Sequence, residues 1–315
     1  MGRMPDMNVN RINDSLANRV ENRNKDTQTK IWNGTKTALL FVVMTLIAIV
    51  LLFPYVFMLN KSLMTSEQVI DPQVLFFPDF LNLQFQNYVT LFTQELNGIN
   101  FGTALLHTLA IVLFNIVAIP LSASMAAFAF SKLKWKGRNV VFACMMVTIM
   151  LPGVVTQIPL YIMYTKIGWI NTLWPFMIPN LFGGGALYIF LIRQYMMGIP
   201  NELIDAAKVD GCSMGRIYLQ IVLPNCKTIL IYIMINVFYN IWGDYYGPLL
   251  YLNSSEAPLT FAYALFKAST EGNAATYYAN IRMAGGVFMT LFPAILFTIF
   301  QNQLTDGALT TGLKG

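Results

Sequence analysis

Residues 199–224 read IPNELIDAAKVDGCSMGRIYLQIVLP, a polar stretch between two long apolar segments. The pattern predicts two short helices. The first, NELIDAAKV, follows Pro200 and ends at Gly211, a residue that suits the left-handed turn closing many helices. The second begins after Ser213, whose hydroxyl suits an N-cap, and is stopped by Pro224.

The 199–224 loop is amphipathic, so its helices have one side that packs against protein and one side that is exposed to solvent. Small or apolar residues predict a side that fits a shallow groove: Leu203, Ala206, Ala207 and Cys212. Charged residues keep the other side in water: Glu202, Asp205, Lys208, Asp210 and Arg216. In a membrane protein such a helix pair presents a knob to a partner protein. Without a partner it would be an amphipathic helix lying at the membrane surface.

The composition indicates a membrane protein. The chain has 315 residues, of which 56% are hydrophobic and only 11% are charged, and its mean hydropathy is +0.55. A soluble domain is usually about a quarter charged. The net charge is +5, but the basic residues lie beside apolar segments and form no dense basic face with interleaved aromatic residues. This distribution argues against nucleic acid as a partner.

The chain shows no pattern of a metal or nucleotide site. Cys144, Cys212 and Cys226 form no C-x-x-C pair, and the single His107 lies in an apolar run. His107 is therefore predicted to pack between helices rather than to bind a metal. No Gly-Lys pair is followed by Ser or Thr, so the sequence has no P-loop. We expect no cofactor in this chain, and any ATP would be hydrolysed by another chain.

The apolar segments predict an all-α, polytopic membrane protein with six transmembrane helices. Each segment has roughly 20 residues or more, enough to cross a hydrocarbon layer of ~30 Å. Residues 1–36 are polar and are predicted to form a disordered cytoplasmic tail. The spans fall at about 37–59, 103–130, 139–163, 173–192, 228–250 and 283–301. Prolines interrupt several of them at Pro120, Pro152, Pro159 and Pro179. Gly183-Gly184-Gly185 favours close helix packing, with a hinge as the alternative.

The positive-inside rule orients these spans. With the N-terminus in the cytoplasm, most of the 20 Lys and Arg residues lie inside, including the KLKWKGR cluster at 132–138 and Lys314. Both termini and the 199–224 loop are then cytoplasmic, and the protein is a multi-pass protein of the cell membrane. Two long loops, 60–102 and 251–282, lie outside. The first is rich in aromatic residues and is either a cap that meets an extracellular partner or an ordered surface loop without that role.

The 199–224 loop resembles the EAA loop of importer-type ABC transporter permeases, whose pattern is E-A-A, then D-G-A, then I-x-L-P. The motif is present as Asp205-Ala206-Ala207, Asp210-Gly211-Cys212 and Ile221-Val222-Leu223-Pro224. Asp205 replaces the usual Glu, Cys212 replaces Ala, and Thr228 stands where a second Pro is common. In that family the loop is the coupling helix, which docks into a cleft of the ATPase subunit. We therefore call 199–224 the coupling loop.

Other segments resemble the maltose-type carbohydrate permeases. They are FPYVFMLNKS (53–62) with Asn87-Tyr88, AFAFSKLKWKGR (127–138), MLPGVVTQIPL (150–160), WGDYYGPL (242–249) and the MalG-like tail GALTTGLKG (307–315). The chain is thus expected to have a cytoplasmic tail (1–36), which the resemblance does not cover, a first helix with an extracellular loop (37–102), a permease core (103–302) and a cytoplasmic C-terminal tail (303–315). The resemblance also implies an importer that has a second, different permease subunit, two ATPase subunits that bind ATP, and an extracellular solute-binding protein.

Two sets of residues are candidates for the site. The resemblance implies coupling to the ATPase by Glu202, Asp205, Ala206, Ala207, Asp210, Gly211, Arg216, Leu223 and Pro224. Polar residues at i, i+4 spacing on the fifth span suggest a solute path, with further candidates on the third: Tyr232, Asn236, Asn240 and Asp244, then Gln157, Tyr161 and Tyr164. Amides, carboxylates and aromatic faces suit sugars. The same stripe could instead pack against the partner permease through interhelical hydrogen bonds.

Three other functions compete with a carbohydrate importer. The transported solute could be something other than a sugar. A self-sufficient secondary transporter would need ion-coupling groups within the membrane, and only Asp244 and His107 are available. A membrane-bound enzyme would need a convergent catalytic set, and no Ser-His-Asp, metal-ligand or paired-carboxylate cluster is present in the sequence.

Overall fold

The computed structural model describes residues 9–71, 73–74, 76–270 and 278–312, with side chains described between 36 and 301. Within these ranges the regular structure is helical, and the one β-bridge joins Leu96 and Ile99. The predicted all-α class is confirmed. The chain divides into two units, residues 1–57 and 58–315. Lys314 and the end of the C-terminal tail lie outside the described residues.

Helix α1 covers Val9–Ser62, and its part Lys36–Ser62 is long and apolar enough to span a membrane. The prediction that residues 1–36 are disordered is wrong for residues 9–36, which are helical. The reason is local. No proline lies between Pro5 and Pro54, so a helix nucleated in the apolar segment can extend towards the N-terminus at little cost per residue.

Four described helical stretches could cross a membrane singly: Lys36–Ser62, Phe101–Ser131, Trp174–Met197 and Ala279–Gln301. Two bent pairs also qualify if each counts as one span. Arg138–Met150 (α5) meets Gly153–Lys166 (α6) at 100°, and Met214–Asn225 meets Lys227–Trp242 (α11) at 75°. With both pairs the count reaches the predicted six. The segment at 139–163 is therefore not one straight helix, because the backbone breaks at Leu151-Pro152.

The core of the second unit forms around α4 (Phe101–Ser131), which packs against α7 (Ala186–Met197) and α11. The face of α4 that is fully buried carries small residues, Ala123, Ser124 and Ala127. Small side chains let helices approach closely where lipid removes the hydrophobic drive between them. The hydroxyl groups of Ser124 and Tyr218 lie 2.7 Å apart and join α4 to the coupling loop.

The predicted span at 173–192 is only partly an α-helix. Its first part is a pair of 3₁₀ turns, Trp174–Phe176 and Ile178–Phe182, and α7 begins after the three glycines. These glycines have φ of +99°, +61° and +121°, which explains the break. A Cβ on Gly184 would lie 2.6 Å from Cγ2 of Ile119 in α4, so the predicted close packing is confirmed.

Other prolines are tolerated inside helices or turns. Pro120 lies within α4 and Pro159 within α6, whereas Pro179 falls in the second 3₁₀ turn. The expected interruptions at Pro120 and Pro159 are therefore absent from these described helices. A proline removes one backbone hydrogen bond, and a helix in a membrane protein can stay continuous when neighbouring groups satisfy the freed carbonyl oxygen.

The loop at 60–102 is ordered and contains α2 (Ser66–Ile70) and α3 (Gln86–Thr93). The Asn87 side chain donates to the carbonyl oxygens of Ser62 (2.8 Å) and Met64 (2.9 Å), and Asn280 of α15 (Ala279–Gly312) donates to Asn87. Helix α13 (Phe261–Thr270) belongs to the same cluster, in which Phe261 packs on Phe101 and Phe288. Whether the loop docks an extracellular partner stays a prediction.

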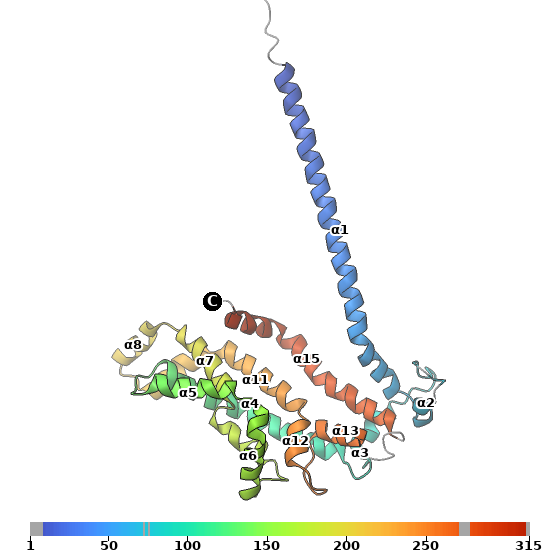
Figure 1. Cartoon of the computed structure of the whole chain (residues 1–315), viewed down its shortest axis with the longest axis vertical. Coiled ribbons are helices and arrows are strands. Elements are labelled where there is room, and N and C mark those ends of the chain that lie inside the picture. Colours follow the sequence, from blue (N-terminus) through green and yellow to red (C-terminus); the bar gives the residue numbers. More distant parts are fainter. Residues whose placement is uncertain (1–8, 72, 75, 271–277, 313–315) are drawn as a thin grey trace, which may run out of the picture. The chain divides into compact units, whose positions relative to one another are not determined.

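Within the second unit, α8 (Asn201–Val209) of the coupling loop lies at one end, and α3 and α13 lie at the other (Figure 1). Helix α15 extends to Gly312, so residues 303–312, expected as a tail, continue the last span as a helix.

Candidate functional site

The coupling loop folds as two short helices, as predicted. Helix α8 ends at Val209, Asp210 is its C-cap, and Gly211 takes the left-handed conformation with φ of +79°. The amide of Cys212 then donates to the carbonyl oxygen of Ala207 at 2.9 Å, which closes the helix end. Helix α9 (Met214–Ile217) begins with Ser213 as its N-cap, whose hydroxyl oxygen accepts from the Arg216 amide at 3.3 Å.

The packing side of α8 differs from the prediction. Ile204 and Ala207 are buried in the core that also holds Met196, Ile217 and Tyr218. Ala207 therefore faces the chain itself rather than outwards, and Cys212 is half-buried. Only Leu203 and Ala206 of the predicted small-residue side are exposed. The apolar residues of α8 divide between two faces, and the sequence pattern alone did not show which face the core would take.

The outward surface of α8 combines charge with apolar side chains. Leu203 is 47% exposed and Val209 is 88% exposed. The five predicted charged residues are all exposed, in agreement with the prediction: Glu202, Asp205, Lys208, Asp210 and Arg216. Lys208 Nζ lies 2.8 Å from Asp205 Oδ1. The hydrogen bond from Lys208, and next its positive charge, lower the pKa of the Asp205 carboxyl group.

Lys132 ties the coupling loop to the end of α4. Its Nζ donates to the Ile199 carbonyl oxygen at 2.6 Å and to Asn201 Oδ1 at 3.0 Å. Burial lowers the pKa of this lysine, while nearby Cys226 and Glu202 act in the opposite direction. Sequence reasoning placed Lys132 only in the basic cluster. The sequence feature that could have singled out Lys132 is its position directly after α4, next to the last carbonyl groups of that helix, where a lysine is often structural.

Pro224 does not stop the second helix where predicted. Tyr218–Val222 form a π-helical turn, and α10 (Leu223–Asn225) includes Pro224 in its first turn. The amide of Leu223 donates five residues back, to Tyr218. This shift in register removes the need for an amide at Pro224, so the chain turns only after Asn225. Leu223 and Pro224 therefore lie at the corner between the coupling loop and α11.

The predicted polar stripe on α11 is shorter than the spacing suggested. Helix α11 ends at Trp242, so Asp244 does not continue the face of Asn236 and Asn240. The Asn236 amide donates to the Tyr232 carbonyl oxygen of its own helix at 3.0 Å. Asn240 donates to the Tyr188 hydroxyl of α7, also at 3.0 Å.

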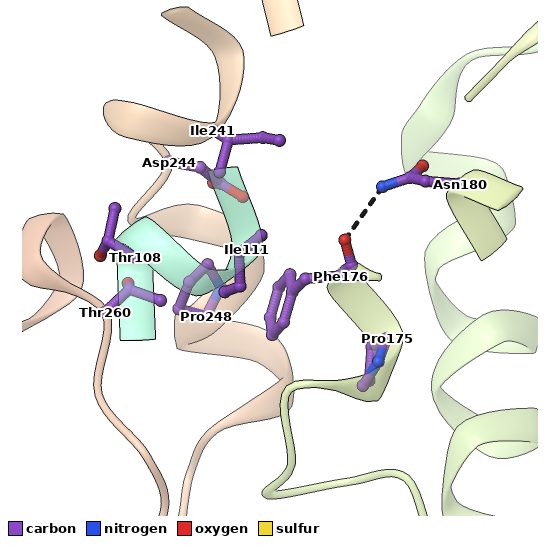
Figure 2. A pocket seen from close by; sticks show the side chains of 9 residues that line it. All are labelled: Thr108, Ile111, Pro175, Phe176, Asn180, Ile241, Asp244, Pro248 and Thr260. Atoms are coloured by element: carbon purple, nitrogen blue, oxygen red, sulfur yellow. Dashed lines mark hydrogen bonds between the residues drawn. The ribbon is translucent and has the colours of Figure 1, made fainter. Parts of the chain in front are cut away.

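Asp244 instead lines a cavity of about 170 Å³, shown in Figure 2. Its Oδ1 accepts from the Gly247 amide at 2.9 Å. A Cβ at position 247 would lie 2.6 Å from Asp244 Oδ2, so a larger residue there would displace the Asp244 carboxylate. Thr108 of α4, Phe176 and Thr260 also line the cavity. Among the described residues, the buried Thr260 Oγ1 has no hydrogen-bond partner.

The candidates on α6 meet a different part of the chain. Tyr246 of α12 (Tyr246–Tyr251) donates to Gln157 Oε1 at 3.1 Å. Asn253 donates to the Tyr161 hydroxyl oxygen at 3.3 Å. The buried Tyr164 packs edge-on against Tyr251, with 5.2 Å between ring centroids. The predicted path residues thus lie in three places: between α11 and α7, between α6 and residues 246–253, and, for Asp244, in the separate cavity.

These groups contain amides, hydroxyls and aromatic rings, which can bind a hydroxylated solute without a metal. Within the described parts of the chain, no group of three or more His, Cys, Asp or Glu residues is placed to hold a metal ion. His107 packs as predicted, with Nδ1 3.0 Å from the Leu259 carbonyl oxygen.

The family described as "Binding-protein-dependent transport system inner membrane component" matches residues 118–307, which include the whole coupling loop. The chain belongs to this family. It is therefore a multi-pass membrane component of a transport system that depends on a binding protein.

Named permease proteins of transport systems align with most of the chain. The arabinooligosaccharides transport system permease protein AraQ of Halalkalibacterium halodurans is 30% identical, over 88% of this chain and 96% of that protein. The lactose transport system permease protein LacG of Rhizobium radiobacter is 28% identical, over 85% and 93%. A crystal structure of a bacterial ABC transporter involved in the import of alginate has the same fold, with a TM-score of 0.72 and 21% identity, covering 83% of this chain and 93% of that chain.

Proposed function

We propose that this chain is a permease subunit of an ATP-driven ABC importer for a carbohydrate, a sugar or oligosaccharide. It forms the translocation path with a second, different permease, and an extracellular binding protein delivers the solute. The observation that carries the proposal is the coupling loop within a family match of residues 118–307. The carbohydrate class is supported by the relatives, which transport arabinooligosaccharides and lactose.

In this proposal two partner ATPase subunits bind and hydrolyse ATP, and this chain transmits their movement to the membrane-spanning helices. The outward face of α8 docks on an ATPase subunit through Leu203, Ala206 and the charges around Asp205. Closure of the ATPase pair moves α8. Because Ile204 and Ala207 are packed in the core and Lys132 holds the start of the loop, the movement passes to α4 and α7 as a body. The helices then rotate together, and the solute cavity between the two permease subunits opens to the other side of the membrane.

The solute path in this proposal runs past Gln157, Tyr161 and Asn240, whose side chains are at least partly accessible. Their hydrogen bonds to Tyr246, Asn253 and Tyr188 can be exchanged for hydroxyl groups of a sugar. Both termini and the coupling loop lie in the cytoplasm, because that orientation places most basic residues inside.

The test is purification of the tagged chain in mild detergent, followed by identification of the co-purifying proteins and reconstitution in liposomes. We expect a second permease, a P-loop ATPase and a binding protein. We also expect ATP-dependent uptake of the sugar that this binding protein retains. Uptake of a solute that is not a carbohydrate would contradict the carbohydrate class alone. Uptake by the chain without any ATPase, driven by an ion gradient, would contradict the importer.

A further inference from the structure

A basic cavity lies where α4 ends and α5 begins. It has a volume of about 450 Å³ and opens to solvent on the surface of the second unit. We call it the basic cavity; the side chains and backbone that line it belong to Lys134, Trp135, Gly137, Arg138, Asn139 and Val140. Two of these residues are cations, none is acidic, and Lys136 is exposed in the same short loop.

The frame of the basic cavity is held in place by local contacts. Trp135 donates from Nε1 to the Ala129 carbonyl oxygen at 3.1 Å, and its ring lies 5.8 Å from that of Phe130. Arg138 donates from Nη1 to the Leu133 carbonyl oxygen at 3.0 Å. Gly137, with φ of +86°, makes the turn between them. The Trp135 ring is therefore held in place, and Lys134 and Lys136, its neighbours in sequence, are both exposed.

The charge of the basic cavity is not neutralised by the carboxylates near it. Lys134 acts on one carboxyl group, that of Asp205, and contributes to lowering its pKa. Asp205 already pairs with Lys208 at 2.8 Å. The cavity therefore keeps a net positive charge and favours an anion.

The wall beside the basic cavity is apolar. Val140, which lines the cavity, is 67% exposed and belongs to α5, a helix with no buried residue. Val147 and Met150 further along α5 are 58% and 81% exposed. In a protein that spans the membrane, such a surface suits acyl chains. Trp135 suits the level of the headgroups, where tryptophan rings are enriched.

We propose that the basic cavity binds the headgroup phosphate of an anionic phospholipid, whose acyl chains lie along α5. A soluble phosphate would use the cations and leave the apolar surface of α5 unused, whereas a phospholipid engages both. A basic pocket between membrane-spanning helices is a known type of lipid headgroup site. The site lies in the loop that begins at Lys132, and Lys132 contacts the coupling loop at Ile199. A bound lipid would therefore also stabilise the contact between Lys132 and the coupling loop.

The test is native mass spectrometry of the full chain, purified together with its co-purifying subunits and mixed with equal amounts of phosphatidylglycerol and phosphatidylcholine. We expect retention of phosphatidylglycerol over phosphatidylcholine. The double variant Lys134→Gln/Lys136→Gln should weaken phosphatidylglycerol binding by about 25-fold, because each lysine near a lipid surface contributes roughly fivefold. Both lysines are exposed, so the variant should keep the thermal unfolding midpoint of the wild type.

A matched control distinguishes binding at the basic cavity from a general effect of net charge on lipid binding. Lys166→Gln/Lys227→Gln removes two exposed lysines, one at the end of α6 and one at the start of α11, and changes the net charge equally. It should bind phosphatidylglycerol as the wild type does. Equal losses in the two double variants, or no loss in the first, would overturn the proposal. Competition by soluble glycerol phosphate as strong as that by the lipid would also overturn it, because the apolar surface of α5 would then contribute nothing.

Discussion

Lys132 Nζ lies 2.6 Å from the carbonyl oxygen of Ile199, so one lysine joins the end of α4 to the first residue of the coupling loop. Asn201 Oδ1 accepts a second hydrogen bond from the same ammonium group. The loop is thus attached to the core at its start by charge-assisted bonds and along α8 by the buried Ile204 and Ala207. A movement of α8 would therefore be transmitted to α4 directly.

Replacement of Lys132 tests this junction. Lys132→Met keeps the length of the side chain but removes both hydrogen bonds, each of which is worth about 1.5–3 kcal/mol when a charged group takes part. We expect uptake to fall by tenfold or more, while ATP hydrolysis by the assembled complex loses its stimulation by the binding protein. Lys227→Met, which changes an exposed lysine at the start of α11, is the control and should keep both activities. Equal behaviour of the two variants would contradict a role for the Lys132 contacts.

The backbone at Gly211 gives a second test. A Cβ at this position would meet no atom within 4 Å, but φ is +79°, so Gly211→Val is strained only through its backbone. We expect it to abolish uptake while the protein still inserts into the membrane. Gly215→Val adds the same side chain at another open position without a positive φ and should be tolerated far better. Gly211→Asn should retain activity, because asparagine accepts the left-handed conformation. Normal uptake by Gly211→Val would remove the coupling role.

Gly184 tests the close approach of the broken fourth span to α4. Gly184→Ala places a Cβ 2.6 Å from Cγ2 of Ile119 and strains a φ of +61°. We expect a loss of stability of about 2–4 kcal/mol, measured as a lower thermal unfolding midpoint in detergent. Adding Ile119→Ala should restore part of the loss, because it removes the clash but not the strain. Gly153→Ala, in open space, is the control.

Asn240 distinguishes a solute contact from helix packing. Asn240→Leu removes the amide, whereas Tyr188→Phe removes the hydroxyl that Asn240 contacts at 3.0 Å but leaves the amide in place. If Asn240 lines the path, only Asn240→Leu should raise the KM for uptake, by about tenfold for a lost hydrogen bond of ~1.4 kcal/mol. Equal changes in thermal stability with unchanged KM in both variants would assign the pair to packing.

The charge of Asp205 should not vary over the physiological pH range. Lys208 lowers the pKa of Asp205, so any stability from the pair is present above the unfolded pKa of about 3.9 and is lost only as the pH falls through the lower folded value. Between pH 5 and 8, the ratio of uptake by Asp205→Asn to uptake by the wild type should therefore stay constant. A ratio that changes with a midpoint in this range would show that Asp205 titrates there and that Lys208 does not hold its charge.

Much of this protein could be predicted from the order of its residues. Long apolar segments predict membrane-spanning helices, because the hydrocarbon layer of the membrane is the solvent that suits them. Gly211 and Ser213 predict a helix end and a helix start, because left-handed backbone and N-caps need those residue types locally. The helical class, the coupling loop with its charged, solvent-exposed side, and the close packing at Gly183 and Gly184 follow from such local rules, and the structure agrees with them.

The tertiary structure decided what local rules leave open. Periodicity shows that α8 has apolar residues but not which of two faces meets the core, so Ala207 is buried although it was expected to face outwards. Spacing extends a stripe from Asn240 to Asp244, but α11 ends between them, and the turn at Gly247 directs Asp244 into a separate cavity. Lys132 reaches Ile199 across 67 residues of sequence. Such contacts depend on how helices far apart in the chain pack together, which no short pattern of residues specifies.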